Sequence, residues 1–209
     1  MKSKVQLLAC VLVLGTALMQ TQRAAGQETK TSTLADMKGQ LTLLQGTITA
    51  VVESLEQVKA SAKNDGSLLK AIGDFQSRYQ ALEGQFGTVR AQAVTARARA
   101  KDQYETWQKD LATVQNANIR EKAQERFTDS KKEFDKIVEK AEKAKERAVP
   151  FVADVKDISI YFSADPSADA VKSLSNSIWK LGNKSKSLNG SISDVIEQID
   201  RTLKSLPKK

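Results

Sequence analysis

Apolar side chains recur at alternating steps of three and four residues along most of this 209-residue chain. That spacing places them on one face of an α-helix, and such a face is buried against other helices. Four stripes of this kind are present, over residues 34–62, 72–114, 119–162 and 171–206. The pattern therefore restricts the fold to packed helices before any other property is considered.

The residues between the stripes predict where each helix begins and ends. Asn64-Asp65-Gly66 predicts a turn after the first stripe. Asn118, with Glu121 three residues later, predicts the cap of the third helix. Asp165 and Pro166 predict the cap and first residue of the fourth. We therefore expect helices at about 33–63, 67–115, 118–163 and 166–206.

Turns this short force successive helices to run antiparallel. Aromatic residues make up only 5% of the chain and there are three prolines, a composition that suits long helices. The sequence thus predicts an all-α fold, an elongated antiparallel up-down bundle or coiled coil of about four long helices. We expect one domain over residues 33–206, after a short linker at 27–32 and before a tail at 207–209.

Two segments conflict with simple helix preferences. Pro150 lies within the third stripe, where proline removes a backbone hydrogen bond. The stripe keeps its phase across Pro150, so we expect a kink and not an end. The segment Ile-Ser-Ile-Tyr-Phe at 158–162 has strand-forming residues, but it also keeps the helical phase and is predicted to be helical. Trp179 is predicted to fill space opposite Pro150.

Residues 1–26 resemble a cleaved export signal. Lys2 and Lys4 precede an apolar run over residues 7–19, and the small residues at 24–26 suit a signal peptidase. The run is shorter than the roughly 20 apolar residues that span a bilayer. We therefore expect export to the periplasm. The alternative is a lipoprotein anchored at Cys10, but the apolar run continues well beyond that residue and favours cleavage.

The inventory of reactive side chains is small. The chain has no histidine, and its single cysteine lies in the expected signal peptide. Disulfides, cysteine or histidine catalysis, and zinc sites with nitrogen or sulfur ligands are then excluded from the mature chain. We predict no catalytic, cofactor-binding or metal-binding residues and no small-molecule substrate. The third hypothesis is a carboxylate-based enzyme or metal binder. It is disfavoured because the carboxylates fall mainly outside the stripes and so outside the interior of the bundle.

The first expected helix is the shortest, and it can cover the second only to about residue 97. The turn at 116–118 should therefore have fewer covering helices. Exposed apolar stripes usually mark contacts. We predict a self-association or protein-partner surface in this less covered half, at Trp107, Leu111, Phe127 and Phe134.

A second candidate surface is basic. Residues 84–101 contain no acidic side chain, and Arg90, Arg97 and Lys101 would share one helical face. Such a face could contact anionic lipid headgroups or an acidic polymer. The other interpretation is a solvated face neutralised by acidic residues of a neighbouring helix. Nucleic-acid binding is not expected, because an exported chain with interleaved charges does not suit it.

An ordered series of short motifs resembles a known family. The motifs are NDGSLL at 64–69, Tyr79-x-x-Leu82, YETW at 104–107, NANIR at 116–120, Phe127, Ser130, Phe134, AVPF at 148–151 and SLSNSI at 173–178. Together they resemble the bacterial domain-of-unknown-function family number 2959, over roughly residues 34–206. The resemblance implies an exported, sometimes lipid-anchored, all-helical protein of Gram-negative bacteria. It implies no activity and no catalytic residues.

The sequence therefore favours a non-enzymatic helical scaffold or interaction protein of the cell envelope. The alternative is a peripheral membrane or anionic-polymer binder that uses the basic face.

Overall fold

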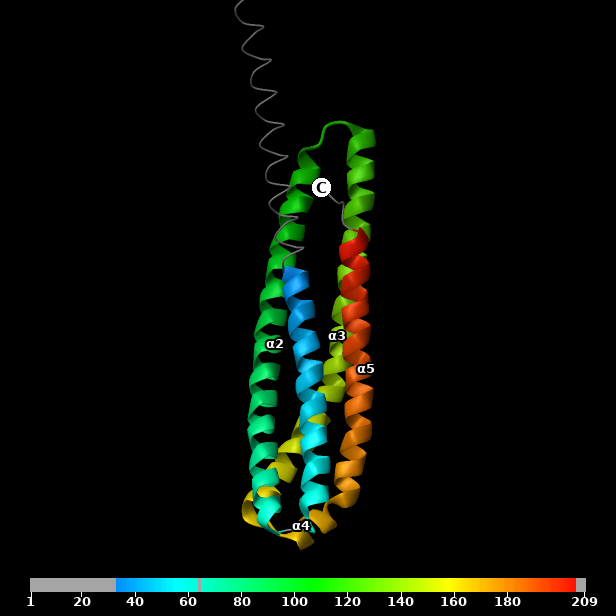
Figure 1. Cartoon of the computed structure of the whole chain (residues 1–209). Helices are drawn as coiled ribbons and strands as arrows, with labels where there is room; N and C mark the ends of the chain where they lie inside the picture. Colours follow the sequence, from blue (N-terminus) through cyan, green and yellow to red (C-terminus); the bar gives the residue numbers. More distant parts are fainter. Residues whose placement is uncertain (1–32, 64, 206–209) are drawn as a thin grey trace, which may run out of the picture.

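The computed structural model describes residues 33–63 and 65–205. These residues form a long rod of helices, and they contain no strand (Figure 1). The first helix spans residues 33–61 and is followed by α2 (Asp65–Thr113), α3 (Ala117–Ala164), α4 (Ala168–Ser173) and α5 (Ser175–Ser205). The predicted all-α bundle is confirmed. The expected signal peptide, linker, Cys10 and tail lie outside the described residues.

Polar contacts show which helices are neighbours and how they run. Between the first helix and α5 the contacts are Lys38 with Asp200, Gln45 with Ser193 and Thr49 with Asn189. Residue numbers rise on the first helix as they fall on α5, so this pair is antiparallel. The other neighbouring pairs are joined by Gln40 with Gln85, Gln76 with Ser163, Tyr104 with Ser130, and Asp154 with Lys184. The four long helices therefore close into a ring.

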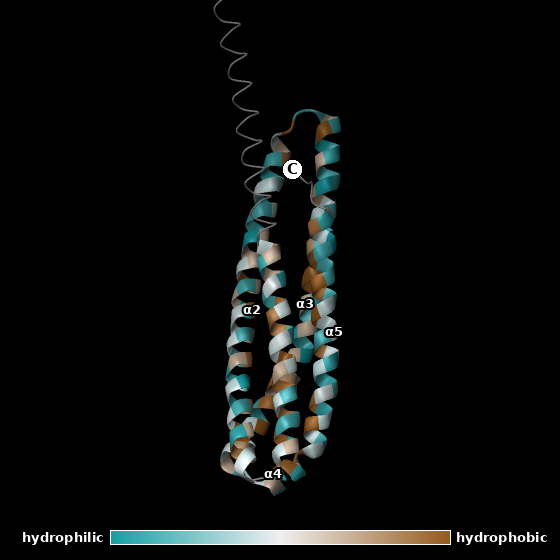
Figure 2. Ribbon diagram, viewed as in Figure 1, coloured by the Kyte–Doolittle hydropathy of each residue, from teal (hydrophilic) through white to brown (hydrophobic). Residues whose placement is uncertain are grey.

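The predicted stripes meet inside this ring as one continuous apolar core. Hydrophobic residues alternate with hydrophilic ones along each helix, as the stripes require (Figure 2). The largest core side chains gather toward the end of the rod that carries α4. Phe75 and Phe162 are at most 1% exposed there, and their rings meet edge to face with centroids 6.1 Å apart. Burying one such ring stabilises the fold by about 1.5–3 kcal/mol.

The fourth expected helix is divided in two. Leu174 separates α4 from α5, although its N–H and carbonyl still make helical hydrogen bonds to Ala170 and from Ile178. The hydroxyls of Ser173 and Ser175 donate to backbone carbonyls of the preceding turn. Hydroxyls that bond back in this way bend helices, and two of them flank the interruption.

Two predicted caps are each wrong by two residues. Asn116, and not Asn118, caps α3: it has an extended backbone, and its side chain accepts from the Ile119 N–H at 3.2 Å. Ser167, and not Asp165, caps the next helix by accepting from Ala170 N–H, also at 3.2 Å. Asp165 instead ends α3. Each true cap lies two residues from the predicted one, a shift that stripe spacing alone does not detect.

The helix α3 continues through Pro150 and includes residues 158–162, as predicted. Pro150 and Glu146 are exposed, so water can satisfy the Glu146 carbonyl that loses its helical donor. The prediction for Trp179 is wrong. Its side chain is 63% exposed, because Ile178 and Leu181 hold the buried face of α5 and Trp179 points outside that face. The turn after the first helix begins at residue 62, and Asp65 and Gly66, which were predicted to lie in that turn, already belong to α2. Asn64 lies outside the described residues.

Candidate interaction surface at the hairpin end

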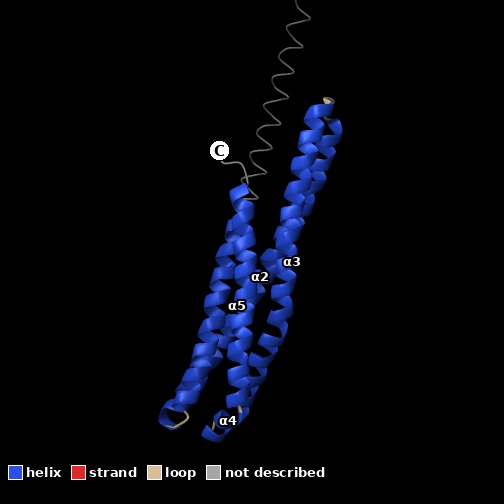
Figure 3. Cartoon of the chain, turned by 90° about the vertical axis from the view of Figure 1, so that its right-hand side faces the viewer, coloured by secondary structure: helices blue, strands red, loops and turns tan. Residues whose placement is uncertain are grey.

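The rod changes from four helices to two near one end. The first described residue, Thr33, accepts a hydrogen bond from Arg99 Nη1 at 3.2 Å, and α5 ends at Ser205 close to the same level. Of the helices that the structure describes, only α2 and α3 continue beyond that level, to their turn at residues 114–116 (Figures 1 and 3). We call residues 104–130 the hairpin end.

Aromatic residues fill the seam between the two helices of the hairpin end. Tyr104 and Phe127 meet edge to face with centroids 5.7 Å apart, and Trp107 and Phe127 do so at 5.4 Å. The ring centroid of Phe134 lies 6.1 Å from that of Tyr104, at the junction with the four-helix part. Leu111 is only 4% exposed, whereas Trp107, Phe127 and Phe134 are half-buried. The structure thus brings the four predicted contact residues into one seam.

The phenol of Tyr104 fixes the two helices at the base of the hairpin end. Its hydroxyl donates to the Ser130 carbonyl oxygen at 2.8 Å and lies 3.1 Å from the Ser130 hydroxyl. Burial raises the pKa of Tyr104 above its ordinary value, so the phenol stays protonated and keeps its donor at physiological pH. The bond sets the register between α2 and α3 where the other helices end.

A small pocket lies at this junction. Its volume is about 50 Å³, and apolar atoms dominate its wall. The first helix contributes Leu34, α2 contributes Ala100, and α3 contributes Phe134. The pocket was not predicted from the sequence, because its wall combines residues from helices whose relative ends were unknown.

The tip carries one exposed apolar side chain that the sequence analysis did not single out. Ile119, in the first turn of α3, is 59% exposed. It belongs to the third stripe, whose later members such as Phe151 and Val155 lie in the core, but Ile119 lies at the tip. Its place directly after the Asn-Ala-Asn turn was the only signal that could have shown its exposure.

The predicted basic face is paired with acidic side chains. Arg97 lies 3.2 Å from Glu142 of α3, and Lys101 lies 3.8 Å from Glu105. Hydrogen bonds from Lys145 and then Arg97 hold the pKa of Glu142 below its usual value. Arg90 is exposed on the same helix. The positive charge of this face is therefore partly neutralised.

A second, larger pocket of about 140 Å³ lies between α3 and α5. Basic and acidic side chains share its wall, among them Lys143, Arg147 and Asp194. A hydrogen bond to Glu139 raises the pKa of Lys143, so its amine stays protonated and does not act as a base at neutral pH. Across residues 33–63 and 65–205, no three histidine, cysteine or acidic side chains are grouped as metal ligands.

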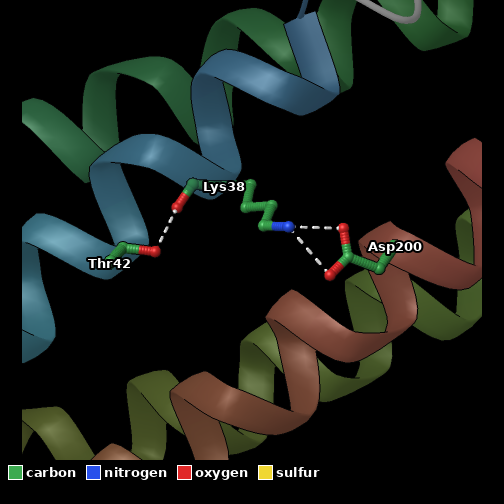
Figure 4. Close-up of polar contacts among 3 residues, drawn as sticks. All are labelled: Lys38, Thr42 and Asp200. Carbon is green, nitrogen blue, oxygen red and sulfur yellow. Dashed lines mark hydrogen bonds and ion pairs between the residues drawn. The ribbon is translucent and has the colours of Figure 1, made fainter.

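Polar residues also fix the first helix along α5. Lys38 Nζ lies 2.7 and 2.9 Å from the two carboxylate oxygens of Asp200, and Thr42 Oγ1 donates to the Lys38 carbonyl (Figure 4). This ion pair is partly exposed, so it contributes at most about 1 kcal/mol. It holds the start of the first helix at the level where the hairpin end begins.

The family model for "Protein of unknown function (DUF2959)" matches residues 22–206. The chain belongs to the DUF2959 family. No curated protein and no solved structure matches it. None of the described helices of this DUF2959 protein combines the length and apolar content needed to cross a membrane.

Proposed function

We propose that this DUF2959 protein is a non-enzymatic scaffold or interaction protein of the cell envelope, and that its hairpin end makes the contact. The observation that carries the proposal is the unequal burial of aromatic residues. Phe75, Phe151 and Phe162 are at most 1% exposed in the four-helix part. Trp107 and Phe127 are only half-buried in the hairpin end.

The chemistry of the side chains supports a binding role. The chain lacks histidine, and its one cysteine lies in the segment that resembles an export signal. Many carboxylates of the described part are in surface ion pairs with lysine or arginine, such as Asp135 with Lys131 and Asp154 with Lys184. Hydrogen bonds from Lys143 and Lys145 hold the pKa of Glu139 and of Glu142 below the usual value for a glutamate. Carboxylates with a lowered pKa are poor general acids near neutral pH.

The architecture also suits a scaffold. At about 1.5 Å per residue, the 49 residues of α2 extend about 74 Å. The four-helix part holds the hairpin end at one extreme of that length. A partner bound there would be kept far from α4 at the other end.

A site-specific photocrosslinking experiment in the cell envelope tests the proposal. In one variant a photoreactive residue replaces Gln115, in the turn of the hairpin end. In the matched control it replaces Ser77, an exposed residue of α2 in the four-helix part. We expect a discrete crosslinked species from position 115 and none from position 77. Equal labelling at both positions, or none at either, would contradict the proposal. Mass spectrometry of the same samples gives the mature N-terminus.

The alternative function is binding to anionic membranes or polymers through Arg90, Arg97 and Lys101. Because Arg97 and Lys101 have acidic neighbours, we expect little binding. Sedimentation with anionic vesicles separates the two functions. Salt-sensitive pelleting that is lost on Arg90→Glu would favour the alternative.

A further inference from the structure

The partner of the hairpin end can be named from the shape of the molecule. Resting on the proposed function, we propose that it is a second copy of this chain, bound antiparallel along the hairpin end. In this pairing Ile119 of each copy enters the pocket at the junction of the other. The structure supplies both halves of the contact, an exposed apolar side chain and an apolar pocket.

The pocket suits a single aliphatic side chain. Its volume of about 50 Å³ is too small for a drug-sized or cofactor-sized ligand, whose sites measure roughly 300–1,000 Å³. Leu34, Ala100 and Phe134 give it an apolar wall. Ile119 is branched and apolar. Among the large hydrophobic residues of the hairpin end, it is the one whose side chain is more than half exposed.

The distance along α3 matches an antiparallel pairing. Ile119 precedes Ser130 and Phe134, which line the pocket, by 11 and 15 residues. At about 1.5 Å per residue these separations are roughly 16 and 22 Å, the length of the hairpin end itself. A twofold axis between Ala123 and Phe127 therefore places Ile119 of one copy level with the pocket of the other.

This arrangement closes at two copies. Each chain offers one Ile119 and one pocket, and a twofold axis uses both at once, as in isologous dimers. The second hairpin would continue the four-helix packing beyond the ends of the first helix and α5. Half-buried Phe127 would then lie beside the partner's half-buried Ala123, which extends the apolar core across the twofold axis.

The charges of the hairpin end allow a copy to approach. Residues 104–130 contain four basic and five acidic side chains, so their net charge is −1. The basic residues are Lys109, Arg120, Lys122 and Arg126, and the acidic residues are Glu105, Asp110, Glu121, Glu125 and Asp129. Two surfaces with so small a net charge repel each other only weakly, and the interleaved signs allow pairing across the contact.

Disulfide crosslinking tests the pairing, because Cys10 is the only native cysteine. In a Cys10→Ser background, purified Ile119→Cys protein is mixed with Gln103→Cys protein and oxidised. We expect a crosslinked dimer, because Gln103 lines the pocket. We expect none from Ile119→Cys protein alone, or from its mixture with Ser77→Cys protein. A disulfide-linked dimer formed by Ile119→Cys protein alone would overturn the register.

Light scattering gives a second readout. We expect wild-type protein to be a dimer, and Ile119→Asp to raise the dissociation constant about 100-fold or more, because two side chains per dimer lose their burial. Exposed Ile119 lies outside the core, so circular dichroism should be unchanged. A monomer in the wild-type protein would overturn this inference, whatever occupies the pocket. If position 115 still crosslinked to another protein, the proposed function would stand without it.

Discussion

Glycines on the outer faces of the helices give a sharp test of the fold. Gly39 and Gly46 lie in the first helix, and Gly84 and Gly87 lie in α2. Apart from the adjoining backbone of the same helix, no heavy atom lies within 4 Å of a Cβ built at any of these four positions, and no described glycine has a positive φ. The backbone is therefore already helical there, and solvent occupies the space that a methyl group would fill.

Replacing all four glycines with alanine should stabilise the protein. Glycine inside a helix costs about 0.5–1 kcal/mol relative to alanine, mainly because it is more flexible when unfolded. The methyl groups at 84 and 87 would be neighbours one helical turn apart, but all four face open space, so the effects should add approximately to about 2–4 kcal/mol. For a chain of this size each 1 kcal/mol shifts Tm by about 2–4 °C, which predicts a rise of roughly 5–15 °C.

Urea and thermal unfolding followed by circular dichroism measure this gain. The matched control is Ala91→Gly, an exposed position of α2, which should lose about 0.5–1 kcal/mol. If the fourfold alanine variant were no more stable than wild type while Ala91→Gly lost stability, the four glycines would not lie on open helix faces. The placement of the outer surfaces of the first helix and α2 would then be wrong.

Three further predictions concern the core, a helix cap and a buried phenol. Phe75→Ala removes a fully buried ring and should lower the free energy of unfolding by about 3–5 kcal/mol, measured by urea unfolding. Asn116→Ala should cost about 0.5–2 kcal/mol and increase hydrogen exchange at the start of α3, whereas Asn118→Ala should have little effect. Burial, with a smaller effect from Glu83, raises the pKa of Tyr79 from 10.0 to about 12. The Tyr79 phenol therefore binds its proton more tightly in the folded chain than in the unfolded chain. The stabilisation that protonated Tyr79 gives the fold is complete below about pH 10 and is lost as the pH rises toward 12. Absorbance titration of wild type and Tyr79→Phe should show the late-ionising phenol only in wild type.

The stripes predicted the helices well because burial of an apolar face is repeated at every turn. A single residue such as Pro150 changes one hydrogen bond, while its neighbours Ala148 and Phe151 keep the face in phase. Helix ends depend on one or two side chains instead. The caps Asn116 and Ser167 were therefore missed, although α3 begins at residue 117, one residue from the predicted start.

The candidate site was only partly predictable for a related reason. The seam residues Trp107 and Phe127 belong to stripes, so their pairing followed from the expected hairpin. The pocket depends on where the first helix begins relative to α2, and contacts such as Arg99 with Thr33 set that level. Trp179 shows the opposite error: a large aromatic residue one position beside a stripe points away from the core.

The hairpin end depends on the rest of the rod for its stability. Two short antiparallel helices in water do not bury enough apolar surface to stay folded alone. Here they are the continuations of α2 and α3, which are fixed farther along by buried residues such as Leu82 and Phe151. The four-helix part thus holds half-buried Trp107 and Phe127 in a fixed geometry before any partner binds. A surface ordered in advance loses little conformational entropy on association, so a small contact area can give a useful affinity.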